Sequence, residues 1–106
     1  MNVGELKRYA AGLAYAGKHK KAAQIYERIL KLSPLDAQVA LKLAETRRRL
    51  GDLPAARSGF EKAAALFQAA GLHGKAEAAS RLVTELSLKS EQPSSGEVRW
   101  WRRLFA

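Results

Sequence analysis

Apolar residues recur every three or four positions along most of the chain, and polar residues fill the positions between them. Five such stripes run over residues 6–13, 22–30, 39–50, 56–70 and 76–86; the first includes Tyr9 and the third ends at Leu50. This period places apolar side chains on one side of an α-helix, whereas a half-buried strand would alternate residue by residue. No segment alternates in that way, so the sequence predicts an all-α fold.

Glycines mark the ends of three of these helices. Gly17, Gly51 and Gly71 follow the first, third and fourth stripes, at the position where glycine commonly stops a helix. The pattern therefore predicts five helices separated by short turns.

Capping residues mark where two helices begin. Before the third stripe, we expect Ser33 to cap the helix, with Pro34 at its first position and Asp36 facing the free N–H groups. Asp52 is expected to cap the fourth helix, which Pro54 enters in its first turn.

The glycines belong to an internal repeat with an offset of 34 residues, because GKHKKA at 17–22 aligns with GDLPAA at 51–56. In each copy a glycine stops one helix, a small residue lets the next helix cross closely, and an aromatic residue follows four positions later. The aligned pairs are Leu6 with Ala40, Tyr9 with Leu43, Ala10 with Ala44, and Tyr26 with Phe60.

This register resembles the tetratricopeptide repeat family, whose repeat unit is a helix–turn–helix of the same length. Residues 3–34 match the family pattern, and Pro34 lies where the family places its proline. Residues 37–68 depart from it, because Arg47 stands where the family has an aromatic or apolar residue and no proline ends the second helix. The resemblance implies antiparallel helix hairpins stacked as a short solenoid of two repeats.

A third echo, GLHGKA at 71–76, follows the second copy by only 20 residues. In one interpretation the fifth helix covers the open face of the fourth as a capping helix, which completes a domain over residues 1–90. In the other interpretation the similarity does not indicate a further repeat, because any glycine-ended helix followed by an alanine-rich helix has such a sequence. Because repeat arrays usually need about three units to bury a continuous core, we expect self-association or stabilisation by a partner.

The charge of the chain is strongly positive and uneven. Its net charge is +9, and residues 1–33 hold seven Lys or Arg against two Glu, whereas residues 51–90 hold five against four acidic residues. A basic first half favours anionic partners, although a solvated basic face explains it equally well. The chain has no cysteine, no apolar run approaching the ~20 residues of a membrane span, and no signal-peptide core. We therefore expect a cytoplasmic protein.

The sequence offers little for catalysis. His19 and His73 take equivalent places in two of the echoes, and we expect both to pack under the turns, because no cluster of Cys, Asp or Glu accompanies them. A phosphate-binding loop is lacking, and Ser58 with Gly59 lies inside a predicted helix rather than in a nucleophile elbow. We expect no enzymatic activity, no metal and no cofactor.

The resemblance also implies where a partner binds, because the family presents extended peptides with a concave groove lined by the first helix of each repeat. By position, the groove is expected to contain Lys7, Ala11, Ala14, Tyr15, Gln38, Leu41, Lys42, Glu45, Arg48 and Arg49. Lys7 matches one basic position of the subgroup that clamps acidic C-terminal peptides, but Ala11 replaces the asparagine which that clamp needs. We therefore expect a basic groove for some acidic segment, without the full clamp. For the run from Arg47 to Arg49, the alternative is a solvated helix end.

The end of the chain is a separate feature. Residues 91–97 are polar and contain proline and glycine, so we expect a flexible linker there. In residues 98–106, a helix would place apolar side chains on one face and arginines on the other. The expected contact residues of this tail are Arg99, Trp100, Trp101, Arg102, Arg103, Leu104 and Phe105. We expect the tail to dock on a protein partner or a second copy, ahead of folding back onto the helices and of an anionic membrane surface.

These patterns predict a non-enzymatic adaptor that binds a peptide or protein partner through a basic groove and an aromatic tail. The alternative is a protein that attaches to a membrane surface, or to nucleic acid without sequence preference, through the same charges. Nucleic acid ranks below protein because the sequence lacks an RNP motif, a zinc finger and a clear helix-turn-helix.

Overall fold

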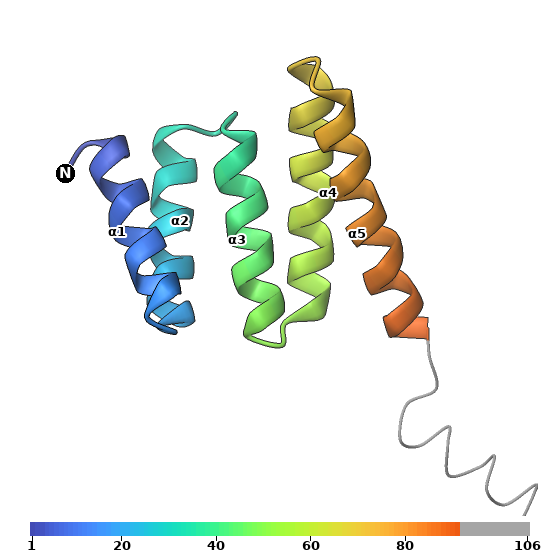
Figure 1. The fold of residues 1–106 in the computed structure, drawn as a ribbon, viewed down its shortest axis with the longest axis horizontal. Helices are drawn as coiled ribbons and strands as arrows, with labels where there is room; N and C mark the ends of the chain where they lie inside the picture. Colours follow the sequence, from blue (N-terminus) through green and yellow to red (C-terminus); the bar gives the residue numbers. More distant parts are fainter. Residues whose placement is uncertain (92–106) are drawn as a thin grey trace, which may run out of the picture.

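The protein forms five α-helices, each joined to the next by a short turn (Figure 1). The computed structural model describes residues 1–91. The helices are α1 (Val3–Tyr15), α2 (His19–Leu32), α3 (Ala37–Arg49), α4 (Leu53–Ala69) and α5 (His73–Glu91). Consecutive helices run in opposite directions and pack against each other. The predicted all-α solenoid of antiparallel hairpins is confirmed, and residues 1–91 contain no strand.

The end of α5 lies close to the predicted boundary of the helical domain. The helix continues to Glu91, one residue beyond that boundary. The rest of the predicted linker and the whole predicted tail, residues 98–106 with the expected contacts from Arg99 to Phe105, lie outside the described residues, so their roles stay predictions.

Three of the helices begin with a side-chain cap. Asn2, Asp36 and Asp52 each accept a hydrogen bond from a free N–H group in the first turn, which satisfies a donor that has no partner within the helix. The bonds run from the N–H of Glu5 to Asn2 at 2.8 Å, of Val39 to Asp36 at 3.1 Å, and of Ala55 to Asp52 at 3.3 Å. In α2, by contrast, Lys18 occupies the cap position and makes no side-chain hydrogen bond there. The predicted cap at Asp52, with Pro54 in the first turn, is confirmed.

The predicted start of α3 is wrong by three residues. Ser33 ends α2 rather than opening α3, and Asp36 is the cap. The N–H of Asp36 donates to the carbonyl oxygen of Ser33 at 3.2 Å, which closes a turn through Pro34. A side chain caps an N–H group two or three residues further on, and the Asp36 carboxylate is placed to do this for the N–H of Val39.

The predicted glycine stops are confirmed at all three turns. Gly17, Gly51 and Gly71 have φ values of 80°, 84° and 78°, a left-handed conformation that other residues rarely adopt. At the first turn, the N–H of Lys18 donates to Leu13 and that of Gly17 to Ala14, which satisfies the last carbonyl groups of α1. The same pair of bonds recurs at the other two turns, so one local design ends α1, α3 and α4.

The repeat register also organises the core. Tyr26 and Phe60 are buried at equivalent positions in α2 and α4, with 4% and 0% of their surface exposed. The aligned pairs Leu6 with Ala40 and Ala10 with Ala44 are buried as well. The pair of Tyr9 and Leu43 breaks the pattern, because Leu43 lies between α2 and α4, whereas no described helix covers that side of α1 and Tyr9 is 46% exposed.

The fifth helix covers α4, as the capping interpretation predicts. Ala76, Ala79 and Leu86 are buried against the preceding helices, and Leu86 shares a cluster with Ala44 and Phe60. Leu50, which the sequence placed in an apolar stripe, follows the end of α3, is 46% exposed and does not belong to this cluster.

Candidate functional site

Two adjoining cavities cross the face formed by α1, α3 and α5, and together we call them the groove. The first, of about 290 Å³, lies between α1 and α3 and is lined by Ala11, Ala14, Tyr15, His19, Tyr26, Lys42, Glu45, Thr46 and Arg49. The second, of about 300 Å³, lies between α3 and α5 and is lined by Gln38, Leu41, Glu45, Lys75, Ala78, Ala79 and Leu82. Glu45 borders both cavities, so they are neighbours on the face of α1, α3 and α5.

Most of the predicted groove residues come together in these cavities. Six of them line the first cavity, and three, including Glu45, line the second. Lys7 and Arg48 line neither. The sequence prediction missed His19, Tyr26 and Thr46 in the floor of the first cavity and the α5 residues in the second. The α5 contribution follows from the repeat only if α5 is treated as the first helix of a third unit, whereas the sequence analysis treated it as a capping helix.

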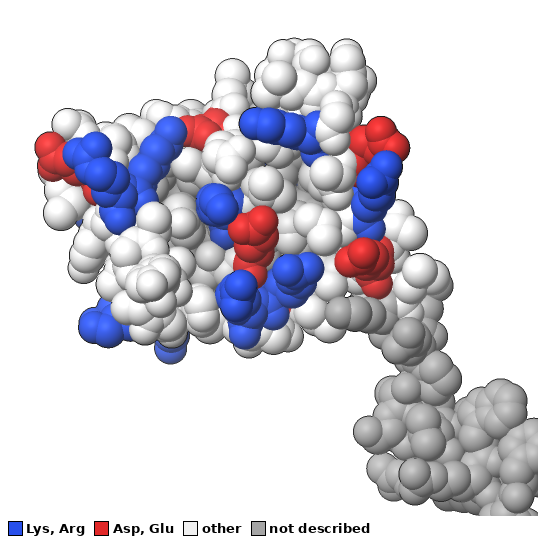
Figure 2. Space-filling model, in the orientation of Figure 1, with Lys and Arg blue, Asp and Glu red and all other residues white. Residues whose placement is uncertain are grey.

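The groove is less basic than its lysines and arginines suggest, because carboxylates accompany two of them. The ammonium of Lys7 lies 2.7 Å from the Asp36 carboxylate, and that of Lys42 lies 3.7 Å from the Glu45 carboxylate. Over α3, a negative side chain lies between positive ones (Figure 2). Among the described residues, no carboxylate lies within 4.0 Å of Arg49, whose charge is therefore available to a ligand.

Asp36 ties α1 to the start of α3. Burial alone would raise the pKa of its carboxyl group, but the hydrogen bond and charge of Lys7 and the N–H groups of Gln38 and Val39 outweigh burial, so the pKa lies below its usual value. The carboxylate therefore stays ionised while it caps α3 and holds Lys7. This contact gives Lys7 a structural partner at one end of the groove.

Two polar side chains lie at the floor of the first cavity. Burial, and to a smaller extent the charge of Glu45, raise the pKa of the Tyr26 phenol, so its hydroxyl stays protonated and can donate a hydrogen bond. His19 is partly buried, and its Nδ1 is enclosed without a hydrogen-bond partner among the described residues. His73, which was expected to pack in the same way, is exposed at the start of α5, so that prediction is wrong.

Arg47 explains one departure from the repeat pattern. Its guanidinium donates to the Glu27 carboxylate at 2.9 Å and so joins α3 to α2. The pair borders a cavity of about 320 Å³ on the opposite side of α3, whose floor includes Ala40, Leu43 and Gly59. An ion pair between helices thus stands where an apolar contact was expected.

The described residues contain no group of three or more His, Cys, Asp or Glu side chains placed to hold a metal ion. Within the same residues, each helix is too short or too polar to cross a lipid bilayer.

Comparison with known families agrees with the geometry. Residues 3–46 match the family model of the tetratricopeptide repeat, which spans α1, α2 and most of α3. A comparison with curated proteins found no match to the chain. Tetratricopeptide repeats generally mediate protein–protein interaction. This match and the 34-residue register of the hairpins support a tetratricopeptide repeat protein.

Proposed function

We propose that the protein is a non-enzymatic adaptor whose groove binds an extended segment of a partner protein. The observation that carries the proposal is the pair of neighbouring cavities, which both border Glu45 and together span α1, α3 and α5. An extended chain makes contacts along a line, so a groove that crosses three helices suits it better than an enclosed site would.

The side chains of the first cavity indicate what such a segment contains. Ala11 and Ala14 project little from α1, so the backbone of a ligand can approach the helix closely. Tyr15 is 96% exposed beside them and offers an aromatic surface at low entropic cost. Arg49 supplies a positive charge without a carboxylate within 4.0 Å in residues 1–88, which suits an acidic side chain of the partner. The proposed ligand is an extended segment with an acidic residue beside an apolar or aromatic one.

Selection from a random peptide library, displayed on phage and presented to the full chain, tests this proposal. The selected peptides should carry an acidic residue, and Ala11→Trp should weaken their binding at least tenfold by filling the first cavity. Ala65→Trp is the matched control, because Ala65 is an exposed alanine of α4 that borders neither cavity. Equal loss in both variants, or selected peptides that ignore Ala11→Trp, would remove the groove from the proposal.

The aromatic tail is proposed as a second contact for the same partner. Its residues lie outside the described part of the chain, so the support for this role is their composition alone: two tryptophans, three arginines and a phenylalanine within residues 98–106.

A further inference from the structure

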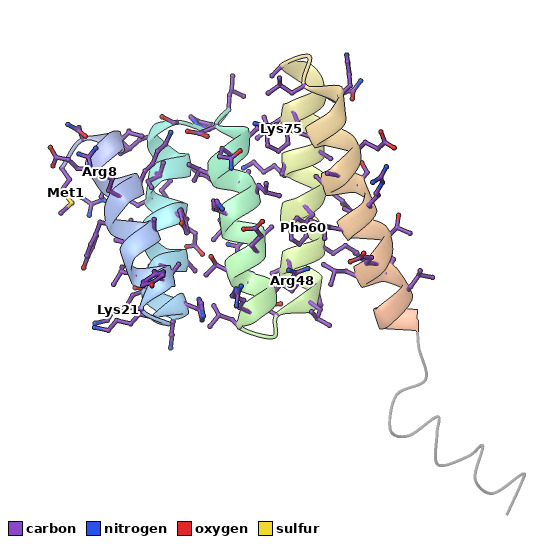
Figure 3. The ribbon with its side chains drawn as sticks, viewed as in Figure 1. Met1, Arg8, Lys21, Arg48, Phe60 and Lys75 are labelled. Atoms are coloured by element: carbon purple, nitrogen blue, oxygen red, sulfur yellow. The ribbon has the colours of Figure 1, made fainter. Side chains whose placement is uncertain are left out.

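One end of the molecule carries several cations, of which only Arg49 also borders the groove. The turns after α1 and after α3 lie at the same end, the lower one in Figure 1. Gly17, Lys18, His19, Lys20, Lys21 and Leu50 line one hollow of about 380 Å³ there. Arg48 and Arg49 come from the last turn of α3, just before Leu50. We call Lys18, Lys20, Lys21, Arg48, Arg49 and Leu50 the basic edge; Lys21 and Arg48 are labelled at this end in Figure 3, and Lys75 lies at the other.

The charges of the basic edge are not neutralised within the described chain. No carboxylate of residues 1–88 lies within 4.0 Å of any of its five cations. The nearest acidic residue in sequence, Asp52, uses its carboxylate to cap α4. Arg48 lies over the ring of Phe60 at 6.0 Å, a contact that orients the guanidinium without neutralising it. Like charges on one end of a molecule attract a polyanion.

An apolar side chain stands among these cations. Leu50 is 46% exposed and borders the same hollow as the three lysines. Tyr15, which is 96% exposed, lies at the end of α1, three residues before Lys18. A phosphate backbone in water gains nothing from an exposed leucine, whereas the boundary between lipid headgroups and acyl chains takes up apolar and aromatic side chains next to basic ones. This combination favours a lipid surface over a nucleic acid.

The position of α5 adds a second signal at the same end. This helix finishes at Glu91, at the same lower end of the molecule as the turns that carry the basic edge (Figure 1). The sequence that follows contains Trp100, Trp101 and three arginines within fifteen residues. One weak signal rarely holds a protein on a bilayer, whereas a basic patch combined with an apolar element does. We propose that the basic edge docks on a bilayer containing anionic lipids, with its cations on the headgroups and Leu50 at the boundary with the acyl chains.

Vesicle cosedimentation with the full chain tests the proposal. The probes are vesicles of phosphatidylcholine alone and vesicles in which about one third of the lipid is phosphatidylserine, both at about 0.1 M salt. Each basic side chain near an anionic leaflet contributes about fivefold in affinity, so replacing three should weaken binding about a hundredfold. The edge variant is K18Q/K20Q/K21Q. The control is R8Q/R28Q/K62Q, which removes three exposed cations elsewhere, each without an ion-pair partner among the described residues.

The expected result is binding to the anionic vesicles only, about a hundredfold loss in the edge variant, and less than about threefold loss in the control. Circular dichroism checks that both variants keep the helix content of the wild type. The groove variant Ala11→Trp should bind vesicles as the wild type does, which separates this proposal from the peptide-binding one. Equal losses in the two triple variants would show that net charge alone acts, and would overturn the proposal. So would a lack of binding to anionic vesicles, or tighter binding to an unrelated DNA duplex than to those vesicles.

Discussion

Replacing Gly59 with alanine tests how closely α3 and α4 pack. Gly59 lies inside α4, and a Cβ atom added there would stand 2.8 Å from the Cβ of Ala44 and 3.3 Å from its Cα. Ala44 is fully buried in α3, so its short side chain has nowhere to move. The two helices would therefore have to separate, and that movement would loosen the packing around the neighbouring Phe60.

Two opposing effects decide the sign of this change. Alanine is favoured over glycine inside a helix by about 1 kcal/mol, and overpacking of a tight core costs about 1–3 kcal/mol. Because the new methyl group meets a Cα and a Cβ rather than a flexible side chain, we expect a cost near the middle of that range and a net loss of about 1 kcal/mol in the free energy of unfolding. Gly12 is the matched control: a Cβ added there meets no atom within 4 Å, so Gly12→Ala should gain about 0.5–1 kcal/mol.

Urea unfolding followed by far-ultraviolet circular dichroism measures both changes. Combining Gly59→Ala with Ala44→Gly should recover part of the loss, because the methyl group is then present on only one of the two helices. We expect a coupling of about 1 kcal/mol or more between the two positions. A Gly59→Ala variant as stable as Gly12→Ala would refute the close approach of α3 and α4.

The remaining predictions concern the cap of α3, the groove and the basic edge. Asp36→Ala should lower the free energy of unfolding by about 1.5 kcal/mol at neutral pH, since it removes a helix cap and a partly exposed ion pair. Folding lowers the pKa of Asp36, so this carboxylate stabilises the fold fully when the pH is above its ordinary pKa of about 3.8. The stabilisation should vanish as the pH falls through the lower pKa of the folded state. A difference in the free energy of unfolding between wild type and variant that persists in acid would contradict this. Lys42→Glu with Arg49→Glu should weaken a selected groove peptide at least tenfold in a fluorescence titration, with helicity unchanged, because it reverses two of the groove's charges. Lys18→Asp should raise the free energy of unfolding by about 1 kcal/mol and weaken binding to anionic vesicles; unchanged unfolding would show that the start of α2 cannot accept a cap.

The fold was largely predictable because its signals are local. Gly17, Gly51 and Gly71 end helices through their own backbone conformation, and Asp52 caps a helix through an N–H group three residues away. The start of α3 was misplaced because Ser33 and Asp36 are both good caps. The choice between them depends on how the whole turn closes, through the bond from the Asp36 N–H to the Ser33 carbonyl.

The electrostatics of the site were not predictable, because they depend on contacts between residues far apart in sequence. Lys7 was expected to serve a ligand, but the register of α1 against α3 brings it to Asp36, 29 positions away. Arg47 meets Glu27 across 20 positions for the same kind of reason. A count of basic residues therefore overestimates the charge of the groove and says nothing about where uncompensated charge remains.

The two repeats differ at the cap position before their second helices, where the first repeat has Lys18 of the basic edge and the second has Asp52. Lys18 and Asp52 both follow a left-handed glycine and precede a helix, and their backbones are nearly the same, with φ and ψ of −87° and 63° against −86° and 78°. Asp52 caps its helix, whereas Lys18 leaves the first turn of α2 without a side-chain cap and places a cation at the positive end of the helix dipole. Together with Lys20 and Lys21 in the same turn, this arrangement lowers the stability of α2. Folding alone would favour an acidic residue there, so the lysines are better explained by an anionic surface that binds this end of the molecule.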